Sequence, residues 1–87
     1  MSTIEEVVYA AIRKVKPSLL ETELSLATRF DDYRITSMEM AMIVFEIEDH
    51  YDIEIEAHTL IDFDTIGAAC EFIAKLLAKK NLQGVAT

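Results

Sequence analysis

Apolar side chains recur every three to four residues in three segments of this chain, and this spacing is typical of one face of an α-helix. The segments cover about residues 3–16, 36–51 and 64–80. A chain of 87 residues has room for one compact domain. The spacing therefore predicts an all-α fold, a small four-helix bundle of three main helices plus one short helix.

Capping residues mark where these helices begin and end. Thr3 and Thr36 are each followed three residues later by a glutamate, Glu6 and Glu39, which is the capping-box pattern. Pro17 ends the first helix, because proline cannot continue it. The residues expected to cap a helix start are thus Thr3, Thr36, and Asp64 or Thr65.

The segments between the helices differ in character. The connection 18–36 is too apolar for a solvated loop, so we expect it to pack across the core, with a short helical turn near 18–21. Its large apolar residues are Leu19, Leu20, Leu24, Leu26 and Phe30. Residues 53–55 are expected to be extended, and 57–61 to form the short helix.

The size of the chain bounds what it can do. We expect a single domain over 1–87, with an ordered core over about 3–80 and a flexible tail at 81–87. A domain this small buries only about 60–65% of its unfolded surface and has no deep cleft of enzyme size. This favours a carrier, binding or regulatory module over a self-sufficient enzyme.

The charge balance limits the partners. Acidic residues outnumber basic ones by 16 to 8, and the formal net charge is −8. Nucleic acid and anionic membrane are therefore not expected as partners, because phosphate binding needs clusters of Lys and Arg. A basic protein surface is the natural partner of such a chain, although the same acidity would also serve solubility alone.

The cellular compartment follows from what the chain lacks. Cys70 is the single cysteine, so no internal disulfide can form and a reducing cytoplasm fits best. The first residues show no signal-peptide pattern, and no apolar run approaches membrane-spanning length. We expect a cytoplasmic monomer.

The segment 36–51 has more apolar surface than one helix of a small bundle needs to bury. One side holds Met40, Ile43, Val44, Ile47 and Tyr51, and a polar side holds Glu39, Glu46 and His50. What we call the Met-rich face consists of Met38, Ala41, Met42 and Phe45, with Glu48 and Asp49 at its C-terminal end. This face is either covered by the loop or another helix, or exposed for partners, to which flexible methionines adapt well.

Ser37 stands at the start of the Met-rich face. A hydroxyl at a helix N-terminus normally serves as a cap. A phosphodiester there would also meet free backbone N–H groups and the positive end of the helix dipole. Arg34 could add a cation, whereas Asp31, Asp32 and Glu39 would oppose the phosphate. The residues alone leave both roles open.

The order of motifs along the chain resembles the acyl carrier protein family. Residues 32–39, Asp-Tyr-Arg-Ile-Thr-Ser-Met-Glu, are similar to the family motif Asp-Leu-Gly-x-Asp-Ser-Leu-Asp/Glu. Residues 45–55 are similar to the family's Leu-Glu-x-x-Phe-x-x-x-Ile, and residues 65–73 to its Thr-Val-x-x-Ala-x-x-Tyr-Ile. The resemblance runs from about residue 2 to residue 77.

This resemblance implies a function. Ser37 would carry 4′-phosphopantetheine, added from coenzyme A by a phosphopantetheinyl transferase, and the terminal thiol would hold an acyl group as a thioester. The carrier would do no chemistry itself and would present the acyl group to acyl-loading, condensing or modifying enzymes with basic or apolar docking surfaces. The residues expected to dock these partners are Arg34, Met38, Ala41, Met42, Phe45, Glu48 and Asp49.

Several positions depart from the family motif. Thr36 replaces the aspartate before the serine, Arg34 replaces the glycine, and Met38 replaces the leucine. Met42 replaces an acidic residue in the middle of the second helix, and Glu56 replaces a proline. A housekeeping fatty-acid carrier would be expected to keep both acids. We therefore expect a specialised carrier of a polyketide, nonribosomal peptide or modified-lipid pathway.

The alternative to a modified carrier is an interaction module that keeps the fold, with Ser37 as a helix cap only. Metal sites are not expected. His50 and His58 have no Cys or His at ligand spacing, and Asp62 and Asp64 lack the other ligands of a calcium loop. Cys70 falls on the apolar stripe of the last helix and is expected in the core.

Overall fold

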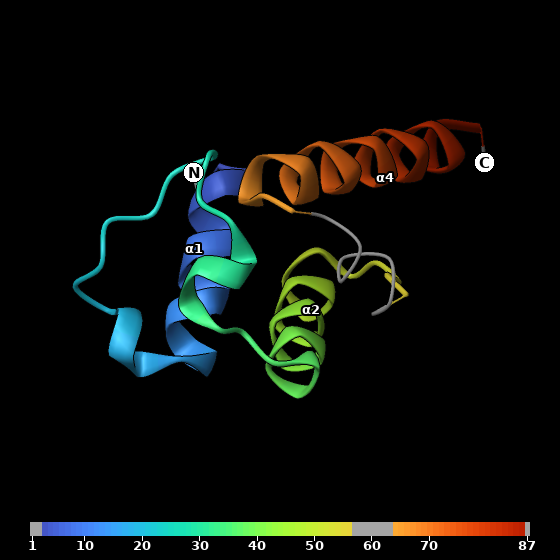
Figure 1. The fold of residues 1–87 in the computed structure, drawn as a ribbon. Coiled ribbons are helices and arrows are strands. Elements are labelled where there is room, and N and C mark those ends of the chain that lie inside the picture. The colour runs from blue at the N-terminus through green and yellow to red at the C-terminus, as the bar shows by residue number, and fades with distance from the viewer. Residues whose placement is uncertain (1–2, 57–63, 87) are drawn as a thin grey trace.

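The helices of the protein form the predicted all-α arrangement. The computed structural model describes residues 3–56 and 64–86, with 81–86 described by their backbone alone (Figure 1). Its elements are α1 (Ile4–Val15), the 3-10 helix η1 (Pro17–Leu19), the 3-10 helix η2 (Phe30–Tyr33), α2 (Ser37–Tyr51) and α4 (Ile66–Ala86). The three main helices confirm the predicted fold class, whereas the short helix expected at 57–61 lies outside the described residues.

Branched aliphatic side chains hold the three helices together. α1 packs against both α2 and α4. The largest side chains with almost no exposure are Val8, Ile12, Ile43, Val44, Ile47, Ile66 and Ile73. Each buried side chain of this kind contributes about 1.5–3 kcal/mol of transfer free energy. Cys70 is also buried in this core, as its position in the sequence predicts.

The predicted caps are present at all three main helices. Thr3 Oγ1 accepts a hydrogen bond from the Glu6 N–H at 3.1 Å. α2 begins with the complete capping box that its sequence predicts. At α4, Thr65 Oγ1 accepts from the Ala68 N–H at 3.2 Å, so Thr65 is the cap and not Asp64.

The connection between α1 and α2 is packed against the core only in part. Its buried residues are Leu19, Leu24 and Phe30. Leu20 and Leu26 are 63% and 43% exposed, so the expectation of a wholly packed loop is wrong for these two. Both leucines stand in turns, and the buried leucines of this connection, Leu19 and Leu24, lie one and two residues before them.

Side chains and backbone atoms tie this connection to two helices. The Arg13 guanidinium of α1 donates to the carbonyls of Leu19 and Thr22, at 3.4 and 2.9 Å. At the start of α4, the Ile66 N–H donates to the Thr28 carbonyl at 2.9 Å. The loop thereby holds η2, which directly precedes the start of α2.

α2 ends at Tyr51, as the sequence predicts, whereas α4 continues beyond the end expected for it. α2 stops where Asp52 adopts a left-handed conformation, with φ 54° and ψ 53°. Lys80 of α4 donates to the carbonyls of Tyr51 and Asp52, at 2.9 and 2.7 Å, which satisfies acceptors that the helix end leaves open. The backbone of α4 stays helical to Ala86, through the segment expected to be a tail, because no proline interrupts it.

Candidate attachment site and docking face

Ser37 is the first residue of α2, and its side chain is exposed. The residue that caps the helix is Thr36, one position earlier. No residue in the described part of the chain forms a hydrogen bond with the Ser37 hydroxyl. The alternative in which Ser37 serves only as the helix cap is therefore wrong about the cap, because Thr36 provides the capping oxygen.

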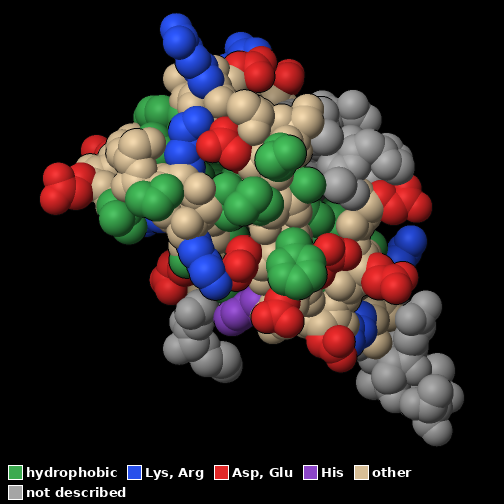
Figure 2. Space-filling view, turned by 90° about the horizontal axis from the view of Figure 1, so that it is seen from below, with side chains coloured by type: hydrophobic (Ala, Val, Ile, Leu, Met, Phe, Trp, Pro, Cys, Tyr) green, Lys and Arg blue, Asp and Glu red, His purple; other side chains and the backbone are tan. Residues whose placement is uncertain are grey.

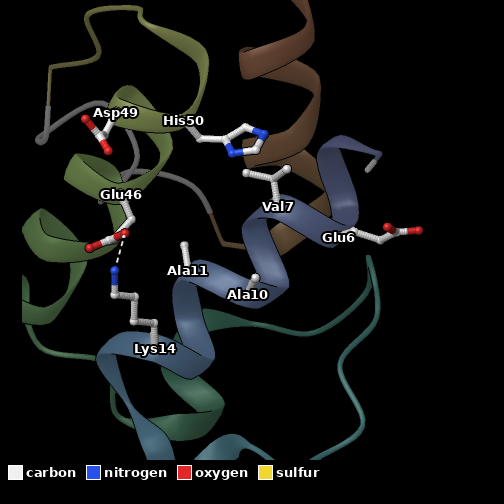
Figure 3. A pocket seen from close by; sticks show the side chains of 8 residues that line it. All are labelled: Glu6, Val7, Ala10, Ala11, Lys14, Glu46, Asp49 and His50. Atoms are coloured by element: carbon white, nitrogen blue, oxygen red, sulfur yellow. Dashed lines mark hydrogen bonds and ion pairs between the residues drawn. The ribbon is translucent and has the colours of Figure 1, made fainter. Parts of the chain in front are cut away.

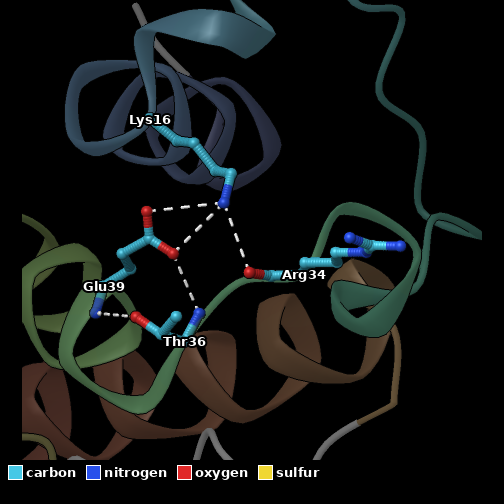
Figure 4. Close-up of polar contacts among 4 residues, drawn as sticks. All are labelled: Lys16, Arg34, Thr36 and Glu39. Carbon is cyan, nitrogen blue, oxygen red and sulfur yellow. Dashed lines mark hydrogen bonds and ion pairs between the residues drawn. The ribbon is translucent and has the colours of Figure 1, made fainter.

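A polar network fixes the backbone on both sides of Ser37 (Figure 4). Thr36 Oγ1 accepts from the Glu39 N–H at 3.1 Å, and Glu39 Oε1 accepts from the Thr36 N–H at 2.9 Å. Lys16, at the end of α1, donates to Glu39 Oε1 and to the Arg34 carbonyl, each at 3.2 Å. A single ammonium group therefore links α1 to the segment before Ser37 and to the first turn after it.

The carboxylate of Glu39 is held in its charged form. The hydrogen bond from the Thr36 backbone is the largest cause that lowers the pKa of Glu39, and the hydrogen bond from Lys16 adds to it. Both partners favour the ionised carboxylate over the neutral acid. The network is therefore intact at neutral pH.

The first turn of α2 fits a phosphodiester on Ser37. The capping box uses the N–H groups of Thr36 and Glu39, which leaves those of Ser37 and Met38 without an acceptor inside the helix. Free N–H groups at a helix N-terminus favour a bound anion. The exposed Arg34 side chain, three residues before Ser37, adds a nearby positive charge.

Arg34 also has an unusual backbone. It adopts the left-handed conformation, with φ 53° and ψ 44°, at the end of η2. This region costs a residue with a Cβ roughly 1–2 kcal/mol, whereas glycine adopts it freely. Arg34 thus has a positive φ at the position where the motif that this segment resembles has glycine, the residue that this conformation favours.

The Met-rich face is exposed, which decides between the alternatives that the sequence left open. Met38, Met42 and Phe45 are 76%, 50% and 65% exposed, and Ala41 is exposed as well. Figure 2 views the molecule from the side on which α2 lies in Figure 1 and shows hydrophobic side chains across the middle of the surface. The four apolar residues of the Met-rich face line an open groove of about 420 Å³ together with Lys14, Val15 and Glu46.

The two acids expected at the end of the Met-rich face differ in role. Glu48 is half-buried, and its Oε2 accepts a hydrogen bond from the Ile55 N–H at 2.7 Å. It therefore stabilises the turn after α2. Asp49 is exposed. Of the groove's residues, the sequence pattern missed Lys14 and Val15, because they come from α1 and no local spacing places them beside α2. It also placed Glu46 on the polar side of the helix, although Glu46 lines the groove.

A second hollow lies between α1 and α2, away from Ser37 (Figure 3). It has a volume of about 250 Å³ and is lined by Glu6, Val7, Ala10, Ala11, Lys14, Glu46, Asp49 and His50. The ring of His50 is exposed and packs edge-on against Tyr51, with centroids 4.8 Å apart. Among the described residues, no group of His, Cys, Asp and Glu side chains could hold a metal ion.

The remaining candidates add no site within the part of the chain that the structure describes. Burial raises the pKa of the Cys70 thiol, which keeps it protonated and unreactive. His58 and Asp62 lie outside the described residues. None of the helices in residues 3–56 and 64–86 combines the length and the hydropathy that a membrane crossing requires.

Comparison with known proteins identifies the family. Residues 11–73 match the family described as phosphopantetheine attachment site. An acyl carrier protein of Streptococcus pneumoniae serotype 4 is 31% identical over 70 residues, covering 74% of this chain and 92% of the relative. The same protein from a second strain of that species matches equally. This chain belongs to the acyl carrier protein family. No solved structure matches it significantly.

Membership in the acyl carrier protein family confirms the resemblance seen in the sequence. The protein is a carrier domain, and its cofactor is covalently attached 4′-phosphopantetheine. Carriers of this family work with a phosphopantetheinyl transferase and with acyl-processing enzymes. The matched residues include Ser37 and all of α2.

Proposed function

We propose that Ser37 carries the 4′-phosphopantetheine and that the chain presents acyl groups, held as thioesters, to partner enzymes. One observation carries this proposal: the Ser37 hydroxyl is exposed and has no part in the capping box that surrounds it. A hydroxyl that a transferase must modify needs to be accessible, and a hydroxyl engaged as a cap would not be.

The chain's own residues would hold the attachment point in place. Thr36, Glu39 and Lys16 fix the backbone beside Ser37, and the N–H groups of Ser37 and Met38, which the capping box does not use, would be available to the phosphate. The prosthetic group supplies the thiol that forms the thioester. The chain has no catalytic role in this proposal.

The Met-rich face would dock the partners. It begins directly after the attachment point, and its apolar side chains remain exposed although α2 already buries another apolar side in the core. We propose Met38, Ala41, Met42 and Phe45 as its main contacts, with Arg34 and Asp49 at its two ends.

The departures from the family motif favour a specialised carrier. Thr36 and Met42 stand where a fatty-acid carrier would have acidic residues. We propose a cytoplasmic carrier of a polyketide, nonribosomal peptide or modified-lipid pathway, served by its own acyl-loading, condensing or modifying enzymes.

The attachment can be tested by intact-mass spectrometry. The chain is co-expressed with a broad-specificity phosphopantetheinyl transferase, beside Ser37→Ala and the control Ser18→Ala, which removes another exposed serine. The wild type and Ser18→Ala should each gain one phosphopantetheine, and Ser37→Ala none. Absence of the adduct from the wild type with several transferases would favour an unmodified interaction module.

A further inference from the structure

We infer that partners of this carrier bind the Met-rich face through an apolar projection, and that basic residues of the partner contribute little. This inference rests on the proposed role of the face in docking. It follows from an arrangement that the sequence does not reveal: lysines of α1 neutralise the glutamates of α2 beside the face.

The groove has the shape and chemistry of a receptor for an apolar group. Ala41 is the smallest residue that lines it, and the long side chains of Met38, Met42 and Phe45 surround Ala41 on the same helix. Val15 of α1 extends the apolar lining. A partner's aliphatic or aromatic side chain would bury these atoms, and methionines would adapt to its shape.

The charged residues of the groove are paired with each other. Lys14 and Glu46 both line it, and Lys14 Nζ lies 3.0 Å from Glu46 Oε2 (Figure 3). The pair adds no net charge to the groove. A basic partner residue would have to compete with Lys14 for the Glu46 carboxylate.

The same arrangement is repeated near Ser37. Lys16 Nζ lies 3.2 Å from Glu39 Oε1, and both side chains are half-buried, at 22% and 26% exposure (Figure 4). Glu39 is also engaged in the capping box. The carboxylate closest in sequence to the attachment point is therefore not free to receive a partner's arginine.

The remaining carboxylates lie at the ends of the face. Glu48 is engaged by the Ile55 N–H. Asp49 is exposed at the C-terminal end, and Asp31 and Asp32 are exposed in η2, before the attachment point. These charges can speed encounter with a basic partner, but contacts at the rim add little to affinity.

Binding to an unmodifiable variant tests the inference directly. The Ser37→Ala chain is titrated with a broad-specificity phosphopantetheinyl transferase, and Kd is measured at low and high NaCl. Since apolar contacts are not screened, we expect Kd to change less than about twofold between roughly 50 and 500 mM. Phe45→Ala in this background should raise Kd about tenfold.

Removing the positive charge of Lys14 should change Kd in opposite directions for an apolar and for a basic partner. Lys14→Met keeps the aliphatic stem but leaves Glu46 unpaired in the groove. An apolar partner must then desolvate that carboxylate, so we expect Kd to rise about threefold. A basic partner would instead bind more tightly. Asp49→Asn is the matched control at the rim and should change Kd less than about twofold.

The outcomes separate this inference from the proposed function. A Lys14→Met variant that binds more tightly, a Kd that rises steeply with salt, or no binding of the Ser37→Ala chain would each overturn the apolar mode. Those results would leave a Ser37 adduct unaffected. An adduct missing from the wild type, with apolar binding retained, would overturn only the attachment.

Discussion

The outer surfaces of α1 and α2 differ although both helices bury the same kind of inner face. α1 turns Val8 and Ile12 to the core and exposes charged residues such as Glu5 and Lys14. α2 also buries an aliphatic stripe, yet it exposes Met38, Met42 and Phe45. Folding requires one apolar stripe per helix. The second apolar surface of α2 is therefore more than the fold requires, which supports the proposed docking of partners there.

Truncating the two faces of α2 should separate stability from docking. Ile47 is 1% exposed, and Ile47→Ala should lower the free energy of unfolding by about 2–5 kcal/mol. Phe45 is 65% exposed, and Phe45→Ala should cost less than about 1 kcal/mol. Urea unfolding followed by circular dichroism measures both. A loss in Phe45→Ala as large as that in Ile47→Ala would mean that the Met-rich face supports the fold.

A negative charge added to the Met-rich face of α2 should weaken transferase binding, whereas the same charge added to the exposed side of α1 should not. Met42→Glu places a carboxylate in the apolar groove and should weaken transferase binding about tenfold. Ala10→Glu adds the same charge to the exposed side of α1 and should change Kd less than about twofold. Calorimetric titration of both variants in the Ser37→Ala background measures this. Equal weakening by both would indicate a general effect of net charge.

Arg34 has a left-handed backbone before α2, and replacing it with glycine should stabilise the fold. Arg34→Gly removes the Cβ from a backbone at φ 53° and should raise the free energy of unfolding by about 0.5–1 kcal/mol. Arg29→Gly is the control, because Arg29 has φ −94° and ψ 139°, and should be destabilising by a similar amount. Thermal unfolding would contradict this account if both substitutions moved Tm in the same direction.

The polar network around Glu39 at the start of α2 should make the stability of the fold depend on pH. The pKa of Glu39 is lower in the folded protein than in the unfolded chain, where it is about 4.3. The stabilisation is complete above the unfolded pKa and is lost as pH falls through the folded one. Tm measured from neutral pH down to about pH 3 should therefore fall less steeply for Glu39→Gln than for the wild type. Parallel curves would mean that Glu39 is not held by Thr36 and Lys16.

Local patterns predicted what depends on local contacts. The bounds of α1 and α2 and the caps at Thr3 and Thr36 follow from spacing within a few residues, and the structure confirms them. The exposure of the Met-rich face remained open, since it depends on which parts of the chain pack nearby. Exposure of Leu20 and Leu26 was missed for the same reason.

The pairing of lysines with glutamates could not be read from the sequence. Lys16 and Glu39 are 23 residues apart, and Lys14 and Glu46 are 32 apart. Only the packing of α1 on α2 brings them together. One alternative took Ser37 as the cap, although the spacing of Thr36 and Glu39 already indicated Thr36, which is the cap in the structure.

Methyl NMR of the methionines tests the role of the Met-rich face most directly. Met38 and Met42 are exposed on this face, whereas Met40 of the same helix is 4% exposed and faces the core. When the transferase is added to the Ser37→Ala chain, the methyl signals of Met38 and Met42 should shift or broaden, and that of Met40 should stay in place. Binding that leaves Met38 and Met42 unchanged would contradict the assignment of this face as the docking surface.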